Sequence, residues 1–281
     1  MTVINTNVKS LISQNALYRN SRDLSSAMEQ LSTGTKVNSA KDDAAGLAIA
    51  TGMDKIIRGQ TVAMRNANEA ISFSQTADSA LGKVSETLQR MRELAVQSAN
   101  GTNSVDQRDA MNAEFSALQS EISRVTENTE FNGLKVLGQD AKQTFQIGAG
   151  TGPDNQIEIA GKDMSSSGPT FGATDKATPR IGIDGTDNTN ALSAMNQIDL
   201  ALKEVTSAQT THGAAQNRMG SVVGGLQVSI ENQTAARSRI MDTDFAAETA
   251  NLAHGQILQQ TSTAMLAQAN QLPNGLMKLL G

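Results

Sequence analysis

The sequence predicts a mainly α-helical protein: long antiparallel coiled-coil helices with a small β-hairpin insert, and N- and C-terminal helices that pair at one pole. Both ends of the 281-residue chain carry apolar residues at heptad spacing, and the segments next to them step by three and four. The middle, residues 130–190, loses this periodicity and holds ten of the 23 glycines, which is typical of turns. The element order nearly mirrors itself about that insert, so we expect the chain to fold back on itself.

Residues 1–40 form the first predicted segment, an N-terminal helix. Its apolar stripe consists of leucines six or seven residues apart: Leu11, Leu17, Leu24 and Leu31. Gly34 follows the stripe, and we expect the helix to end there because glycine adopts the left-handed conformation that closes many helices.

Residues 41–139 form the N-terminal part of a helical core. A long helix is predicted from the acidic pair Asp42–Asp43 to about Asn100, with a break near Gly59. A turn over residues 100–104 then leads into a further helix that ends near Asn128. In both helices the apolar positions step by three and four: Leu81, Val84, Leu88, Met91 and Ala95, then Met111, Phe115, Leu118, Ile122 and Val125.

Residues 140–189 form the insert. Phe145–Ile147 and Ile157–Ile159 alternate apolar and polar residues, as strands do. The Gly-rich segment 148–155 between them predicts a hairpin, and the remainder of the insert is expected to be an exposed loop.

Helix returns in residues 190–237, the C-terminal part of the core, and continues in residues 238–281, the C-terminal helix. In the predicted helix over residues 190–237, three seam positions are polar: Gln209, His212 and Gln216. They weaken the helix pairing locally. In the predicted helix over residues 238–281, an apolar stripe has a spacing of seven residues and consists of Leu258, Met265 and Leu272. We expect Pro-Asn-Gly at 273–275 to interrupt it.

The apolar residues of the two terminal helices leave open how both helices bury their apolar faces. A single pair of helices cannot bury both apolar faces, so one interpretation is that the ends are labile in a free subunit and fold when neighbouring copies cover them. The other interpretation is an ordinary intramolecular coiled coil with both ends docked. The pattern alone leaves both open.

The composition excludes several classes of protein. The chain has no Cys and no Trp, and only 2% of it is aromatic, which argues against thiolate metal sites and against a deep ligand pocket. A net charge of −5 without a basic stripe gives no nucleic-acid surface, and the absence of a long apolar run predicts no membrane insertion. The first ten residues lack the features of a cleaved secretory signal, so any export is expected to use another route.

No catalytic or metal site is predicted, and no cofactor is expected. The carboxylate pairs at Asp42–Asp43 and at Asp242 and Asp244 lack further ligands, so we interpret them as capping or solvated groups. The two histidines, His212 and His254, belong to no zinc motif, and the glycines of 148–152 lack the Lys-Ser/Thr ending of a phosphate loop. An enzyme is therefore not expected.

Several motifs, in order along the chain, closely resemble bacterial flagellin. They cover residues 1–137 and 190–281, and together they are specific although each alone is weak. The motifs are Val3–Asn7, Leu31–Gly34, Asn38–Ile49, Leu88–Ser98, Glu130–Gly133, Ser238–Phe245, Gln256–Gln260 and Leu266–Gln271.

This resemblance implies a structural subunit that polymerises through its terminal helices into the extracellular flagellar filament for motility. The termini, 1–40 and 238–281, would form the inner coiled-coil tube, and the long helices the shell around it. It also implies type III export without a cleaved signal peptide, and as partners the filament cap, the hook-junction proteins and an export chaperone. The large outer domains of the family look absent, so a thin, smooth filament is expected.

The resemblance further implies two surfaces that immune receptors recognise. Gln89, Arg90, Leu94 and Glu114 match the helix surface bound by vertebrate toll-like flagellin receptors. The chain departs from the family pattern at Ala117 and Leu118, and the same side chains are equally suited to contact the next subunit. Leu276, Leu279 and Leu280 resemble the patch sensed by cytosolic receptors, although Gly281 replaces a common terminal Arg and core packing is their simpler role.

Two other functions stay open at this point. One is the related junction protein between hook and filament, which shares the terminal signatures. The other is a secreted adhesion or binding module that acts through residues 140–190, a stretch that is short and Gly-rich for such a role.

Overall fold

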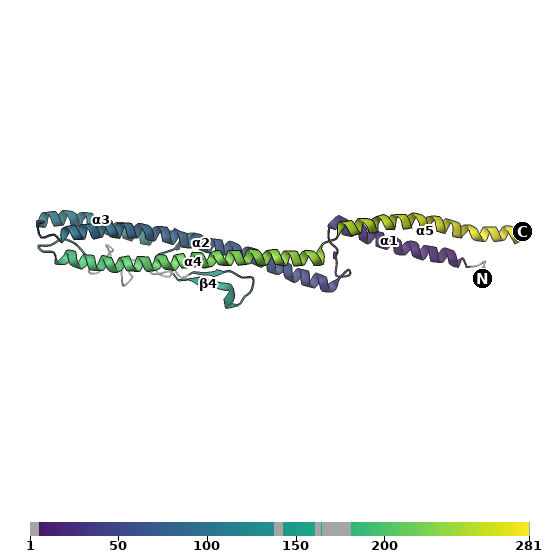
Figure 1. The fold of residues 1–281 in the computed structure, drawn as a ribbon, viewed down its shortest axis with the longest axis horizontal. Helices are drawn as coiled ribbons and strands as arrows, with labels where there is room; N and C mark the ends of the chain where they lie inside the picture. Colours follow the sequence, from purple (N-terminus) through teal and green to yellow (C-terminus); the bar gives the residue numbers. More distant parts are fainter. Residues whose placement is uncertain (1–5, 138–142, 161–163, 165–180, 281) are drawn as a thin grey trace. The chain divides into compact units, whose positions relative to one another are not determined.

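The computed structural model describes residues 6–137, 143–160, 164 and 181–280, and of residues 272–280 it describes the backbone alone. Two compact units divide the chain, Met1–Ile57 with Glu231–Gly281 as the first and Arg58–Ile230 as the second. The elements (Figure 1) are α1 Val8–Thr33, α2 Ala44–Ser98, α3 Val105–Asn128, β1 Glu130–Phe131, β2 Leu134–Lys135, β3 Gln143–Gln146, β4 Gln156–Ile159, α4 Thr189–Met241 and α5 Phe245–Leu280.

In the first unit α1 packs antiparallel against α5 (Figure 1), which confirms the predicted pairing of the two terminal helices. Asn7 caps α1 because its side chain accepts a hydrogen bond from the backbone N–H of Ser10. Gly34, at φ +72°, ends it in the left-handed conformation, as predicted. Beyond it, the Lys36 N–H donates to the Met241 carbonyl at 2.6 Å, so the linker from α1 is bonded to the end of α4.

The interruption predicted at 273–275 is wrong, because α5 continues to Leu280. Pro273 has no N–H to donate to the carbonyl of Ala269 four residues earlier, which is the usual reason that proline breaks a helix. Here Asn7 Nδ2 donates to that carbonyl at 2.8 Å. A side chain from the start of α1 therefore satisfies the group that the proline leaves free.

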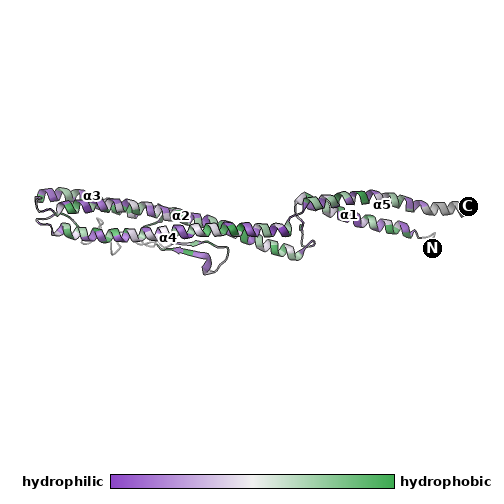
Figure 2. Ribbon diagram, in the orientation of Figure 1, coloured by the Kyte–Doolittle hydropathy of each residue, from purple (hydrophilic) through white to green (hydrophobic). Residues whose placement is uncertain are grey.

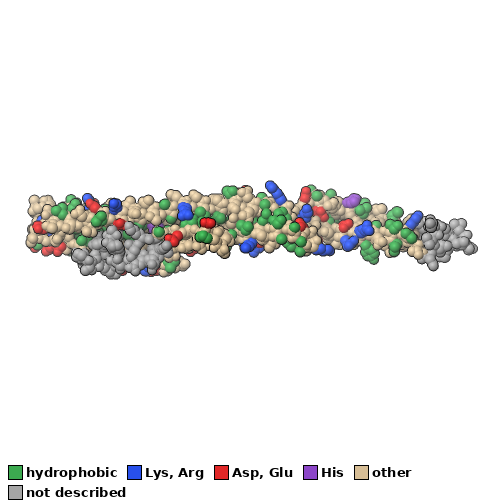
Figure 3. All heavy atoms as spheres, turned by 90° about the horizontal axis from the view of Figure 1, so that it is seen from below, with side chains coloured by type: hydrophobic (Ala, Val, Ile, Leu, Met, Phe, Trp, Pro, Cys, Tyr) green, Lys and Arg blue, Asp and Glu red, His purple; other side chains and the backbone are tan. Residues whose placement is uncertain are grey.

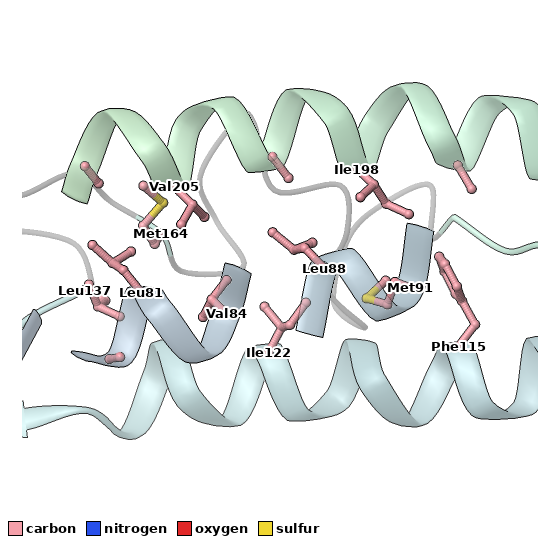
Figure 4. Close-up of a cluster of buried hydrophobic side chains, with 14 of the residues drawn as sticks. Leu81, Val84, Leu88, Met91, Phe115, Ile122, Leu137, Met164, Ile198 and Val205 are labelled. Carbon is pink, nitrogen blue, oxygen red and sulfur yellow. The ribbon is translucent and has the colours of Figure 1, made fainter. Parts of the chain in front are cut away.

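The second unit has its core among α2, α3 and α4. Gln60 Nε2 donates to Ser229 Oγ at 2.9 Å and Arg92 Nε lies 2.7 Å from Asp199 Oδ1, so α2 runs antiparallel to α4. The short turn after Ser98 reverses the chain into α3, whose Glu114 is paired with Arg90. Figure 4 shows the buried side chains of α2 lying between α3 and α4. They are Leu81, Val84, Leu88 and Met91, and they pack with Phe115, Ile122, Ile198 and Val205, most of which lie at the predicted positions.

The break predicted near Gly59 is also wrong, since α2 is continuous from Ala44 to Ser98. A Cβ added to Gly59 would lie 2.6 Å from the Cβ of Ala149, in the loop of the β3–β4 hairpin. The glycine thus lets that loop approach the helix closely, and the helix tolerates its weak propensity because of the packing gained.

Two hairpins pack beside α2. β3 and β4 pair antiparallel with Phe145 opposite Ile157, which confirms the hairpin predicted from alternation. The two-residue β1–β2 hairpin turns at Asn132 and Gly133, both at positive φ, a turn for which Asn-Gly is the usual sequence. Phe73 of α2 contacts a ring from each hairpin, Phe131 at 6.0 Å and Phe145 at 5.9 Å between centroids.

Arg108, near the start of α3, is a buried cation, 3% exposed. Its guanidinium donates to three backbone carbonyls, those of Ser98 at 3.1 Å, Asn100 at 3.3 Å and Gly185 at 3.3 Å. Ser98 in turn donates from its hydroxyl to the carbonyl of Ile183 at 2.6 Å. Arg108 therefore joins the C-terminal end of α2 to the segment that precedes α4.

Candidate assembly interface

The seam between α1 and α5 is built from small, polar and a few apolar side chains. On both helices the buried or half-buried positions alternate in steps of three and four, the spacing of a coiled-coil seam. These positions are Ser10, Ser13, Leu17, Asn20, Leu24, Ala27 and Leu31 on α1, and Leu252, Gly255, Gln259, Ser262, Leu266 and Ala269 on α5.

Hydrogen bonds from α1 cross this seam along its length. Besides the bond from Asn7, Ser10 Oγ donates to Asn270 Oδ1 at 2.8 Å, and Asn20 Nδ2 donates to the Gly255 carbonyl at 2.8 Å. At Gly255 an added Cβ would lie 3.2 Å from Leu24 Cδ1, so the helices are close there. Polar side chains thus fix the pairing, with modest apolar burial.

Outside the seam, α1 and α5 expose several large apolar side chains. Figure 2 shows hydrophobic positions interspersed along both helices, and Figure 3 shows hydrophobic side chains on the molecular surface. Large apolar side chains that stay exposed in a single subunit are candidates for contact with a partner. We call these nine residues the outer apolar face: Val8, Leu11, Ile12, Tyr18, Met28, Phe245, Ile257, Leu258 and Met265, each at least 41% exposed.

The predicted assembly residues divide between the seam and the outer apolar face. Leu17, Leu24 and Leu31 are half-buried in the seam. By contrast, Leu11, Leu258 and Met265 lie on the outer apolar face. The side chain of Leu272, like those of Leu276, Leu279 and Leu280, lies outside the described residues.

Sequence reasoning missed most of the α5 seam, which is Leu252, Gly255, Gln259, Ser262 and Ala269. Together with Leu266, these residues are spaced by three and four. The spacing would have predicted the seam if small and polar residues had been counted as seam positions. Both ends are therefore folded on each other within one chain, as in the docked interpretation. The outer apolar face nevertheless remains uncovered, as the other interpretation requires.

The predicted receptor surface is a polar cluster on α2 and α3. Arg90 donates from Nε and Nη2 to Glu114 Oε1 at 3.1 and 2.9 Å, and from Nη1 to Glu93 Oε2 at 3.0 Å. The hydrogen bonds that Arg90 donates to Glu93 and Glu114 raise the pKa of Arg90 above its ordinary value, so it stays charged. Gln89 is exposed beside it, whereas Leu94 is 3% exposed and lies in the core beneath this surface.

Asp42, Asp43 and Asp244 cap a turn or a helix start, as predicted, while Asp242 accepts a hydrogen bond from the Ser238 hydroxyl. Asp42 accepts hydrogen bonds from the side chain and the backbone of Ser39, which lower its pKa. Asp43 accepts from the Gly46 N–H at 2.8 Å, and Asp244 accepts from the Ala246 N–H at 2.9 Å at the start of α5.

The described residues hold neither a metal cluster nor a membrane span. In the ranges given above, His, Cys, Asp and Glu side chains nowhere gather in threes as metal ligands would. Within the same ranges, each helix lacks an apolar stretch long enough to span a bilayer.

Comparison with known proteins matches both halves of the chain to one family. Residues 4–142 match the bacterial flagellin N-terminal helical region, and residues 195–280 match the bacterial flagellin C-terminal helical region. A flagellin of Halalkalibacterium halodurans is 41% identical over 279 residues, which cover 99% of each chain. A flagellin of Xenorhabdus nematophila is 39% identical over 316 residues, again covering 99% of each.

Among solved structures, the crystal structure of Bacillus cereus flagellin matches with a TM-score of 0.48 and 26% identity, covering 58% of this chain and 88% of that chain. The sequence matches alone decide the family. They extend over nearly the full length of this chain and of its relatives, and they include the helices that form the seam and the outer apolar face. The chain belongs to the bacterial flagellin family.

Proposed function

We propose that the outer apolar face of α1 and α5 is the surface through which copies of this chain join. Flagellins are structural proteins that polymerise with one another into the extracellular flagellar filament, and this chain is such a filament subunit. The observation that carries the proposal is the exposure of nine large apolar side chains on a helix pair whose own seam is largely small and polar.

The physical reason is that burial of a large apolar side chain is worth roughly 1.5–3 kcal/mol, and a single subunit leaves this burial unrealised. Neighbouring subunits supply the missing surface. Leu11, Leu258 and Met265 then contact other copies, while Leu17, Leu24 and Leu31 hold the pair within each subunit. Leu272 is assigned to the same assembly surface from its heptad position alone. No catalytic activity is part of this proposal.

Electron microscopy tests the function directly. Purified full-length chain brought to high concentration is expected to form filaments, thin and smooth because the chain lacks the length for large outer domains. Immunolabelling of cells should then decorate the filament along its length. Label confined to a single ring at the filament base would identify a hook–filament junction protein instead, and failure to polymerise would contradict the proposal.

Further partners belong to the same proposal and rest on the family. They are the flagellar type III export pathway with its chaperone, the filament cap and the hook-junction proteins. A toll-like flagellin receptor is proposed to bind Gln89, Arg90 and Glu114, with Leu94 supporting them from the core. Leu276, Leu279 and Leu280 are proposed as a patch for cytosolic receptors from their sequence positions.

The receptor surface gives a specific prediction. Arg90→Ala removes a planar cation that Glu93 and Glu114 hold in place, and we expect it to weaken receptor binding by roughly tenfold or more, as arginine contacts often do. Arg124→Ala is the matched control, because Arg124 is also exposed and also paired with a glutamate, Glu121. Equal binding by both variants in surface plasmon resonance would remove Arg90 from the receptor surface.

A further inference from the structure

His212 is a buried histidine in the seam of α4. It is 1% exposed, and its ring packs against Phe73 of α2 with 6.4 Å between ring centroids. Its Nδ1 atom is buried and has no hydrogen-bond partner among the described residues. A neutral imidazole tolerates such a site at some cost, whereas an imidazolium would place a charge among apolar rings.

The charges around this site do little to offset that cost. Asp78 of α2 raises the pKa of His212, but burial lowers it by more, so the net pKa lies below 6.5. The other packed elements bring charges that are engaged or turned outward. Glu127 ends α3 and has its own interactions, Glu130 pairs with Lys135 at 2.5 Å, and Glu158 is exposed on β4.

The stretch of α4 around His212 is also intrinsically weak. Two nearby positions, Gln209 and Gln216, are polar and half-buried, whereas the buried neighbours of His212 along the helix are Ala208 and Met219. Gly213, Gly220 and Gly224 follow in the same helix, and a Cβ added to any of them would meet nothing within 4 Å. No close packing requires these glycines, and each weakens a helix relative to alanine. The glycines therefore lower the intrinsic stability of this stretch of α4, which is held mainly by the packing of Met219.

We propose that His212 is an acid-sensitive switch: its protonation expels the imidazole from the α2–α4 seam and opens α4 locally between about Gln209 and Gly224. The direction follows from linkage. Because the unfolded chain binds the proton more readily than the folded one, stability that is fully present above pH 6.5 is lost as the pH falls through that value toward the lower folded pKa. The consequence is a subunit in which the α2–α4 seam loosens in mild acid.

Thermal unfolding of dilute full-length chain tests the switch. His212→Met fills the site with a flexible apolar side chain that does not titrate. Between pH 7.5 and 5.5, we expect the unfolding midpoint of the native chain, followed by circular dichroism, to fall by at least about 2 °C more than that of H212M. The control is His254→Gln, at the chain's other histidine, which is exposed on α5. H254Q should follow the native chain.

The proposal is overturned if the unfolding midpoints of the native chain and of H212M fall by the same amount as the pH falls. A second measurement stands even if H212M folds poorly. In the native chain labelled at the imidazole carbons, NMR should show His212 titrating below pH 6.5, with H254Q assigning the signals. Hydrogen exchange over residues 209–224, corrected for the intrinsic pH dependence, should rise in acid. A His212 that titrates at or above 6.5, or exchange unchanged in acid, would rule out the switch.

Discussion

Replacing Arg108 with methionine is expected to destabilise the second unit by about 3 kcal/mol, which corresponds to a fall of roughly 6–12 °C in its thermal midpoint. The Arg108 guanidinium holds the carbonyls of Ser98, Asn100 and Gly185, and it is almost fully buried. Methionine has similar length but donates no hydrogen bonds. The carbonyls of Ser98 and Gly185 would lose this donor, which is costly because they are buried or half-buried, whereas the Asn100 carbonyl would keep its bond from the Asn103 N–H.

The Ser98 carbonyl belongs to the last residue of α2, where helix carbonyls have no partner within the helix and a cation is favoured, and Asn100 lies just beyond that end. Arg108→Lys keeps the charge but not the fork of donors, so we expect an intermediate loss of stability. Arg124→Met is the control at an exposed arginine. If R108M and R124M shifted the unfolding midpoint equally, the buried contacts of Arg108 would carry no special weight.

The helices could be predicted because apolar periodicity depends on local sequence. The stripe from Leu81 to Ala95 and the alternation in the hairpin each specify one face, and the structure buries the first and, in the hairpin, Ile157 and Ile159, with Phe145 half-buried. The two wrong predictions, at Gly59 and Pro273, concern residues whose effect depends on a distant partner. Ala149 takes up the space left by Gly59, and Asn7 bonds the carbonyl that Pro273 leaves free. Neither partner is visible in a local pattern.

The candidate site was harder to predict than the fold. Leucines spaced by seven residues predict an apolar face of a helix. The spacing does not predict whether that face packs against the partner helix or stays exposed on the subunit surface. Leu24 and Leu258 both belong to such stripes, yet Leu24 lies in the seam and Leu258 on the outer apolar face. The α5 seam is marked by Gly255 and Ala269, whose small size allows close approach but gives no hydrophobic signal. Arg108 gave no signal either, because most arginines are exposed.

Replacing Ile257 with lysine is expected to raise the concentration needed for polymerisation by at least about 50-fold. Ile257 is 62% exposed and lies on the outer apolar face. Its burial against a neighbour is worth roughly 2–3 kcal/mol, and each 1.4 kcal/mol is a factor of ten in association. A buried lysine without a partner adds to the loss. Sedimentation of polymer across a concentration series measures the effect.

The same position provides the control. Ile257→Met keeps an apolar side chain of similar volume, so I257M should polymerise at close to the native concentration. Because Ile257 lies off the seam, I257K monomer should retain native helix content, and circular dichroism separates lost assembly from lost folding. I257K that polymerises like I257M would show that the outer apolar face is not the joining surface. The contacts between copies would then have to come from the long helices α2 and α4, and the exposed apolar residues of α1 and α5 would need another role.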